Sequence, residues 1–381
     1  MMDEKTIKKA ARIIIKSGML PFPVTDTLME IMELLYTEEE LKFIIKAFRR
    51  KPSLTMDQLK DKTDMPEAEI KTLTNSLAKK GALFVSESSS GLKIYRLLPL
   101  IMVGIFEYTY MKKVTFTEEE KKIAVLFEKL FDEVKDVIQE KYDTMIPLFK
   151  QMPPIDRTVP ITEDTEGKEI QVEINEEIEV SPEKVVASQN VNEIIDKFDD
   201  IAVAHCFCRQ HQLLLGHECE QNPPEETCFT FGKSARFVSS QGFGRLISKE
   251  EAKAILEKCD EAGLVHKAYH PHGNIAKEET SLCNCCFDCC GTFLLWRRGV
   301  TPMVNATNYL AQTNLELCTG CGICVEKCPV DAIIINDNNK SERNDDICIG
   351  CGVCARFCPE GAIYLVEGKR TVYVPPPKLK D

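Results

Sequence analysis

Cysteine determines the chemistry that this sequence could perform, because eighteen cysteines occur in 381 residues and all of them follow residue 205. Adjacent pairs such as Cys285-Cys286 and Cys289-Cys290 are poorly suited to a framework of long-loop disulfides. Thiols at this density, with no export signal in view, are typical of metal ligands in a reducing compartment. The sequence therefore predicts metal sites and not disulfides.

The strongest pattern lies near the C-terminus, where one motif occurs twice. It reads Cys-x2-Cys-x2-Cys-x3-Cys-Pro, and each position of the second copy follows its counterpart after 30 residues. Three thiolates with this spacing on a tight loop can reach three irons of one cubane, and glycines between them let backbone N–H groups approach the cluster sulfurs. The two copies contain Cys318, Cys321, Cys324 and Cys328, and Cys348, Cys351, Cys354 and Cys358.

This duplication resembles the bacterial ferredoxin module with two [4Fe–4S] clusters, over about residues 315–366. The resemblance implies that the fourth cysteine of each copy ligates the cluster of the other copy. The loop 336–346 is longer than the compact minimum of that family and strongly polar, so we expect it to decorate the surface. The two implied ligand sets are Cys318, Cys321, Cys324 and Cys358, and Cys348, Cys351, Cys354 and Cys328.

A second cysteine-rich region occupies residues 201–291. A buried strand over Ile201–Ala204 is predicted to lead into its first cysteines, and a helix is predicted between the N-cap Ser248 and Gly263. Nine cysteines outside that helix suffice for two four-thiolate sites, grouped either by run or with thiolates of both runs in one site. We expect one or two further [4Fe–4S] clusters here, with structural zinc as the alternative. The nine are Cys206, Cys208, Cys219, Cys228, Cys283, Cys285, Cys286, Cys289 and Cys290.

Other residues of this region are not expected to bind metal directly. Cys259 stands alone on a helical face and is expected in the core. The six histidines, between His205 and His272, are expected to be outer hydrogen-bond donors or surface residues. Neighbouring cysteines point in different directions, so Cys285 and Cys286 should not serve one site alike. The region resembles ferredoxin-type proteins of anaerobic microbes, and that resemblance implies no defined reaction.

The elements before the cysteines begin with residues 1–110, which contain 17 Lys and Arg against 15 Asp and Glu. Helical patterns start near Thr37, Thr55 and Pro66, and a β-hairpin pattern covers residues 82–97. Three helices followed by a hairpin resemble a winged helix-turn-helix domain. The resemblance implies either DNA binding or docking of a protein.

The DNA alternative would place the third helix in a major groove. Glu67 and Glu69 near its start would repel phosphates, and the region lacks the basic stripe of groove readers. Protein docking is therefore the favoured reading. The four side chains that would face DNA are Lys71, Asn75, Lys79 and Lys80.

A connector follows over residues 111–182. Thr117 is predicted to cap a helix with an apolar stripe that packs in a core or against a partner helix. Residues 151–200 carry 14 acidic against 4 basic residues, which is typical of an acidic linker or edge segment. The stripe comprises Ile123, Leu126, Phe127, Leu130, Phe131, Val134, Val137 and Ile138.

These patterns predict a multi-domain α+β protein. Its segments are a winged-helix-like domain (1–110), the connector (111–182), a cysteine-rich middle domain (183–310) and the two-[4Fe–4S] ferredoxin domain with its tail (311–381). The longest apolar run has ten residues, about half of the ~20 that cross a bilayer. We therefore expect no membrane insertion and a cytoplasmic location.

The expected function is transfer of single electrons between redox partner proteins, including an oxidoreductase, in anaerobic metabolism. Whether the chain is itself an enzyme stays open. One alternative places a substrate site in the middle domain of an oxidoreductase subunit. A second alternative is a redox-sensing regulator that binds DNA through the winged helix, and the balance of 17 basic to 15 acidic residues in the N-terminal region weighs against it.

Overall fold

The computed structural model describes residues 2–18, 23–88, 90–154, 156–174, 190–271 and 277–379. The chain divides into two compact units that alternate along the sequence. The predicted division into four consecutive segments stays a prediction. The first unit comprises Met1–Asp136, Ala204–Glu218 and Lys233–Leu246, and the second comprises Val137–Val203, Cys219–Gly232 and Ile247–Asp381.

The first unit is mainly helical. Its N-terminal elements are α1 (Glu4–Lys16), α2 (Asp26–Leu35), α3 (Glu38–Phe48), β1 (Ser53–Thr55), α4 (Met56–Thr63), α5 (Glu67–Lys79), β2 (Leu83–Glu87) and β3 (Lys93–Leu97). They are followed by α6 (Ile105–Tyr110), most of α7 (Glu118–Glu140), α10 (Phe207–Leu214) and α11 (Lys233–Ser240).

The three helices and the hairpin of the N-terminal region occur where the sequence predicts them. Thr37 and Glu40 form the capping box of α3, and Thr55 caps α4. The hairpin strands β2 and β3 pair antiparallel, with Leu83 opposite Leu97. The short strand β1, which the sequence analysis missed, pairs with β3. The winged-helix assignment itself stays a prediction.

Two of the side chains that would face DNA form ion pairs within the unit. The Lys80 Nζ lies 2.7 Å from a carboxylate oxygen of Glu40, which is 2% exposed. The Lys71 Nζ lies 2.8 Å from a carboxylate oxygen of Glu67. Lys80 therefore neutralises a buried charge within the unit, and the DNA alternative stays a hypothesis.

The predicted apolar stripe of α7 is largely buried. Phe127 and Phe131 pack edge-on against Phe106 of α6, with ring centroids 5.0 and 5.4 Å apart. His211 of α10 joins these rings, and its Nε2 lies 3.1 Å from the Ala124 carbonyl oxygen. The stripe up to Val134 therefore packs in the core of this unit, whereas Val137 and Ile138 belong to the second unit and Val137 is exposed.

The second unit contains most of a large sheet. Its helices are α8 (Tyr142–Phe149), α9 (Val191–Lys197), α12 (Lys249–Glu261), α13 (Gly291–Arg297), α14 (Ile323–Glu326) and α15 (Val353–Arg356). The strands are β4 (Asp156–Val159), β5 (Val172–Ile174), β6 (Ile201–His205), β7 (Glu226–Phe231), β8 (Arg245–Ile247), β9 (Val265–Tyr269), β10 (Ser281–Cys285), β11 (Met303–Thr313), β12 (Ile333–Ile335), β13 (Ser341–Arg343) and β14 (Ile363–Val374).

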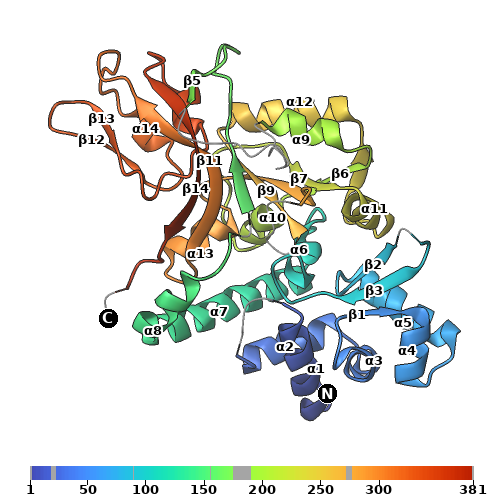
Figure 1. Ribbon diagram of the computed structural model, residues 1–381. Helices are drawn as coiled ribbons and strands as arrows, with labels where there is room; N and C mark the ends of the chain where they lie inside the picture. Colours follow the sequence, from blue (N-terminus) through green and yellow to red (C-terminus); the bar gives the residue numbers. More distant parts are fainter. Residues whose placement is uncertain are drawn as a thin grey trace. The chain divides into compact units, whose positions relative to one another are not determined.

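Nine strands of the described chain form one sheet in the order β5-β14-β11-β4-β9-β10-β7-β6-β8, and β6 and β8 each pass from one unit into the other. α9 and α12 run side by side (Figure 1) and pack on one sheet face, against residues such as Phe229 and Leu282. Because side chains alternate along a strand, Cys283 and Cys285 of β10 occupy the opposite face.

One continuous apolar core connects that opposite face with the loops of the duplicated cysteine motif. It contains Phe293 of α13, Cys285 of β10 and three cysteines of the second motif copy. Helices and sheet are thus combined as the predicted α+β class requires. The core places the cysteines of both regions in one hydrophobic environment, where charged groups need compensation.

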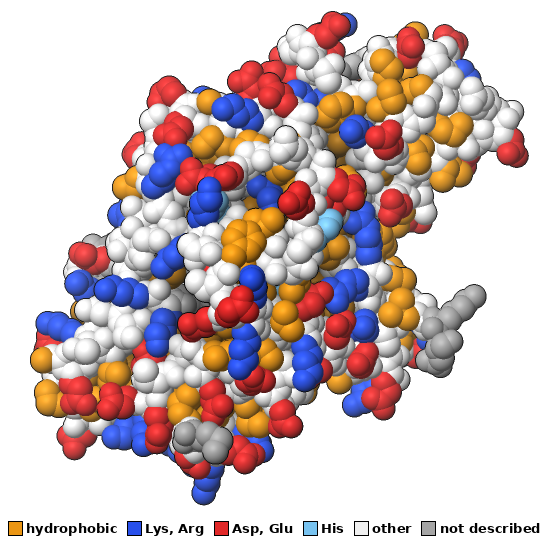
Figure 2. Space-filling view, turned by 180° about the vertical axis from the view of Figure 1, so that it is seen from behind, with side chains coloured by type: hydrophobic (Ala, Val, Ile, Leu, Met, Phe, Trp, Pro, Cys, Tyr) orange, Lys and Arg blue, Asp and Glu red, His pale blue; other side chains and the backbone are white. Residues whose placement is uncertain are grey.

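The surface carries mixed charge. On the face drawn in Figure 2, Lys and Arg side chains are interspersed with Asp and Glu side chains. Within the described ranges, no helix combines the length and the apolar character that a membrane crossing requires.

Candidate metal centres

Thiols from both motif copies surround one pocket. Cys318, Cys321 and Cys324 of the first copy line it together with Cys358 of the second. Burial, and after it the thiols of Cys321, Cys358 and Cys318, raise the pKa of Cys324. Four sulfur atoms around a shared space are the arrangement that a cubane with one thiolate on each iron requires.

A second group of thiols has the complementary composition. Burial, and then the thiols of Cys351, Cys348 and Cys328, raise the pKa of Cys354 well above its ordinary value. Burial, and to a smaller extent the thiol of Cys348, also raise the pKa of Cys328. The fourth cysteine of each copy thus lies with the first three thiols of the other copy.

Backbone geometry explains why glycines stand between the cysteines. Gly350 has a φ of +63°, and a Cβ atom there would lie 2.0 Å from the carbonyl oxygen of Tyr309. Backbone N–H groups also reach the thiols: Ala332 donates to Cys328 Sγ at 3.2 Å and Ala362 donates to Cys358 Sγ at 3.3 Å. Such donors stabilise the charged thiolate form that binds iron.

The loop between the copies lies largely on the surface, as expected, and it also contacts the first group of thiols. Its strand β13 pairs with β12, and the backbone N–H of Ser341 donates to Cys318 Sγ at 3.4 Å. The Ser341 hydroxyl lies 3.5 Å from Cys324 Sγ. Lys340 Nζ donates to the Cys318 carbonyl oxygen at 2.5 Å. The extra length therefore supplies hydrogen bonds around the first group of thiols.

The two groups differ in their access to solvent. Cys321 of the first group is exposed, whereas Cys348, Cys351 and Cys354 are all buried. A redox centre that reaches the surface can exchange electrons with a docked partner, and a buried one is better placed to pass them inward.

Three cysteines of the middle region meet on one face of the sheet. Hydrogen bonds with the thiols of Cys283 and Cys290, and burial after them, raise the pKa of Cys285 well above its ordinary value. Cys228 on β7 is the direct cross-strand partner of Cys283. Residues directly opposite each other share a sheet face, so Cys228 is on the same face as Cys283.

A buried lysine accompanies these thiols. Lys267 lies opposite Cys283 on β9, is 1% exposed and has its Nζ 2.6 Å from an Asp156 carboxylate oxygen. Burial lowers the pKa of Lys267, but Asp156, Cys290 and Cys285 outweigh burial and raise it above its ordinary value. The ammonium group therefore stays charged beside the sulfur atoms. Nothing in the sequence marks Lys267, because one lysine in a strand carries no motif.

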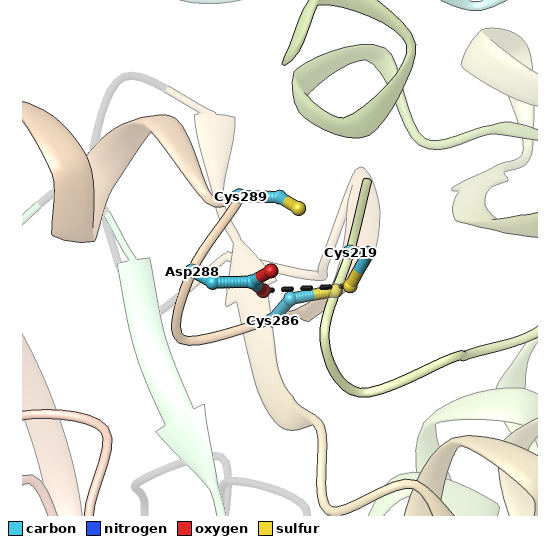
Figure 3. Close-up of side chains that lie close together, drawn as sticks. All are labelled: Cys219, Cys286, Asp288 and Cys289. Carbon is cyan, nitrogen blue, oxygen red and sulfur yellow. Dashed lines mark hydrogen bonds between the residues drawn. The ribbon is translucent and has the colours of Figure 1, made fainter. Parts of the chain in front are cut away.

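Another group in the second unit combines cysteines from distant segments. One ligand atom each of Cys219, Cys286, Asp288 and Cys289 lies within 4.8 Å of the others. Figure 3 shows the Asp288 carboxylate directed at Cys219, whose Sγ lies 3.4 Å from the nearer oxygen. This grouping brings thiols of both cysteine runs together, as in one of the two arrangements that the sequence left open. Asp288 was missed, although it lies within a Cys286-x2-Cys289 spacing typical of metal turns.

The two members of each adjacent cysteine pair lie in different clusters, as expected. Cys285 and Cys290 belong to the large core with Phe293, whereas Cys286 and Cys289 pack with Leu264. Cys259 lies in that second cluster and is 0% exposed, which confirms its assignment to the core.

Two further predicted ligands, Cys206 and Cys208, lie outside the second unit. Cys206 is the N-cap residue of α10 and Cys208 lies in its first turn, and both belong to the first unit. All eighteen cysteines fall within the described ranges, and none forms a disulfide.

His266 and His270 form hydrogen bonds within the protein. His266 is fully buried, with its Nδ1 2.6 Å from Asn284 Oδ1 and its Nε2 2.5 Å from Asp260 Oδ1. Burial lowers its pKa, but Asp260 and Asn284 outweigh burial and raise it. His270 Nδ1 lies 2.6 Å from the Lys277 carbonyl oxygen. His272 lies outside the described residues.

Comparisons with known proteins concern the C-terminal module. Residues 317–363 match the family model of the 4Fe-4S dicluster domain. A probable ferredoxin of Methanosarcina thermophila is 55% identical over 29 residues, which are 8% of this chain and 50% of that protein. The match thus spans half of the length of this curated relative. No solved structure matches the chain. The chain therefore contains a C-terminal [4Fe–4S] ferredoxin module, a type of domain that transfers electrons.

Proposed function

We propose that this protein carries single electrons between partner proteins through a chain of iron–sulfur clusters. The observation that carries the proposal is the pocket in which Cys358 of one motif copy joins Cys318, Cys321 and Cys324 of the other. Two such crossed sites hold their clusters close together, which suits rapid electron transfer.

The proposed ligands follow this crossing. Cys318, Cys321, Cys324 and Cys358 hold the first cluster, and Cys348, Cys351, Cys354 and Cys328 hold the second. When bound, the clusters supply the one-electron chemistry, and the residues of the chain set spacing, access and potential. The amide donors to Cys328 and Cys358 support this assignment.

A third cluster is proposed on the sheet face, with Cys283, Cys285 and Cys290 as ligands and Cys228 as the fourth thiolate. Support comes from the hydrogen bonds that join the first three thiols and from the register that places Cys228 opposite Cys283. Lys267 supplies a buried positive charge beside this anionic site. Cys206 and Cys208 stay predicted ligands in the first unit.

The proposed route runs from the surface to the interior. Partners exchange electrons at the first cluster, because Cys321 is exposed. The second cluster and the sheet-face thiols share one apolar core, so electrons pass inward in short steps. An exposed cluster is sensitive to oxygen, which favours a reducing cytosol and anaerobic metabolism as the setting. The partner class is a redox protein such as an oxidoreductase.

Coulometric titration of the anaerobically purified protein tests this function. Each cluster accepts one electron, so about three electrons per chain are expected for two ferredoxin clusters and one sheet-face cluster. Cys321→Ser should also slow electron delivery to an artificial protein acceptor. Uptake of fewer than about two electrons would contradict the proposal.

A further inference from the structure

We infer that Cys219, Cys286, Cys289 and Asp288 form a tetrahedral site for a single zinc-type divalent ion, separate from the iron–sulfur clusters. All four ligand atoms lie within 4.8 Å of one another. Zinc with Zn–S bonds of about 2.3 Å places tetrahedral ligand atoms about 3.7 Å apart. The present positions need only small movements to bind one ion.

A cubane has different spatial requirements. Each of its four thiolates binds a different iron, so the sulfur atoms stand apart around a pocket, as in the group with Cys358. The Cys219 group offers three sulfur atoms and a carboxylate oxygen, so it lacks the four thiolates of such a cubane. Its three thiolates and one carboxylate match the sulfur and oxygen ligands that zinc accepts, whereas magnesium and calcium prefer oxygen alone.

The surroundings hold the carboxylate in position. Asp288 is 9% exposed, and its Oδ2 accepts a hydrogen bond of 2.8 Å from the backbone N–H of Glu220. Its Oδ1 is thereby directed at Cys219. This is the support that ligating carboxylates commonly receive from outer partners.

Neighbouring contacts fix the two segments that provide the ligands. The Gln221 Oε1 accepts a hydrogen bond of 2.8 Å from the Phe287 backbone N–H. Its Nε2 donates to the carbonyl oxygens of Ala262 and Gly263, both at 2.9 Å. Cys286 and Cys289 are each 1% exposed. The ion would thus join the Cys219 segment to the turn after β10 in an environment that excludes water.

Zinc X-ray absorption of the purified full-length protein tests the site, because the zinc edge is not affected by the iron. Cells are grown with both metals in excess. We expect about one zinc per chain with three sulfur ligands at about 2.3 Å and one oxygen at about 2.0 Å. Absence of zinc, with iron bound through Cys219, Cys286 and Cys289 instead, would overturn the inference.

Asp288→Cys provides the sharpest variant. It should retain zinc and change the coordination to four sulfurs, which a misfolded chain would not do. Retention of three sulfurs and one oxygen would exclude Asp288 as a ligand and overturn the proposal.

Asp288→Asn should speed zinc transfer to a chromophoric chelator at least about tenfold, since even outer partners of metal ligands change affinity by that amount. Glu218→Gln removes a neighbouring exposed carboxylate, and Cys259→Ser removes a buried thiol of the same apolar cluster. Both controls should keep the zinc. Equal zinc loss in Glu218→Gln or Cys259→Ser and in Asp288→Asn would contradict a specific role of Asp288.

Discussion

Single cysteine substitutions test the crossed ligand sets. Cys358 is the most informative residue, because it lines the same pocket as Cys318 although it belongs to the other motif copy. Cys358→Ser should eliminate the same EPR signal as Cys318→Ser, and the double variant should lose no further iron. Cys328→Ser is the matched control and should eliminate the other signal. If Cys358→Ser removed the signal that depends on Cys348, the crossing would be wrong.

Lys267 should set the potential of the sheet-face cluster. Lys267→Gln removes a buried positive charge, so reduction, which adds negative charge, becomes less favourable. The potential is expected to fall by on the order of 60 mV, a tenfold change in the one-electron equilibrium. An EPR-monitored redox titration measures it.

Two further variants control that experiment. Lys267→Gln combined with Asp156→Asn removes both members of the ion pair and should restore most of the potential. Lys197→Met changes a lysine that pairs with Glu279 instead and should leave the potential unchanged. An unchanged potential in Lys267→Gln alone would refute the role of this lysine.

His266 should make stability depend on pH. Its folded-state pKa is raised by Asp260 and Asn284 against the effect of burial. The stabilisation is therefore complete below the unfolded pKa of about 6.5 and is lost as the pH rises through the folded-state pKa. The difference in thermal midpoint between wild type and His266→Gln should shrink from pH 6 to pH 9. A difference that stays constant or grows would disagree with a charged imidazole.

At the scale of elements, the β12–β13 hairpin distinguishes the first cluster from the second. Ser341→Ala removes the hydroxyl beside Cys324 and should lower the potential of the first cluster by tens of millivolts, since hydrogen bonds to cluster sulfurs raise potentials. The second cluster is the internal control in the same redox titration. A shift of both clusters, or of neither, would contradict a specific effect of the hairpin.

Local sequence patterns predicted many of the helices and strands. The order and pairing of the strands could not be predicted, because they depend on contacts between distant segments. Caps such as Thr37 with Glu40, and Ser248, are read from adjacent residues, and the helices begin there. The strand order, by contrast, places β4 between β11 and β9, which no local pattern specifies. The hairpin strand β13 is short and polar, so its contact with Cys318 could not be foreseen.

The same limit explains the candidate sites. The eight ferredoxin cysteines are predictable because their spacing is local and duplicated. The grouping of Cys219 with Cys286 and Cys289 needs the register of β7, β10 and the turns around them, so the sequence left two arrangements open. The positions of Lys267 and Asp288 beside these cysteines also depend on long-range pairing, so the sequence alone does not indicate them.

At the scale of the whole molecule, one apolar core connects the cysteine-rich regions of the second unit. The exposed thiol of Cys321 and the buried thiols of the second copy belong to one ferredoxin module, and the same apolar core continues to Cys285 and Cys290. A compact zinc-type site beside this core would hold its loops in place without taking part in electron transfer.

Iron and acid-labile sulfide per chain, measured with EPR on the anaerobically purified and reduced protein, test the central claim most directly. Two ferredoxin clusters and one sheet-face cluster require about twelve irons and twelve sulfides, with signals of magnetically interacting [4Fe–4S] centres. About four irons or fewer, or reduced signals without interaction between neighbouring clusters, would contradict an electron-transfer chain built on the duplicated motif.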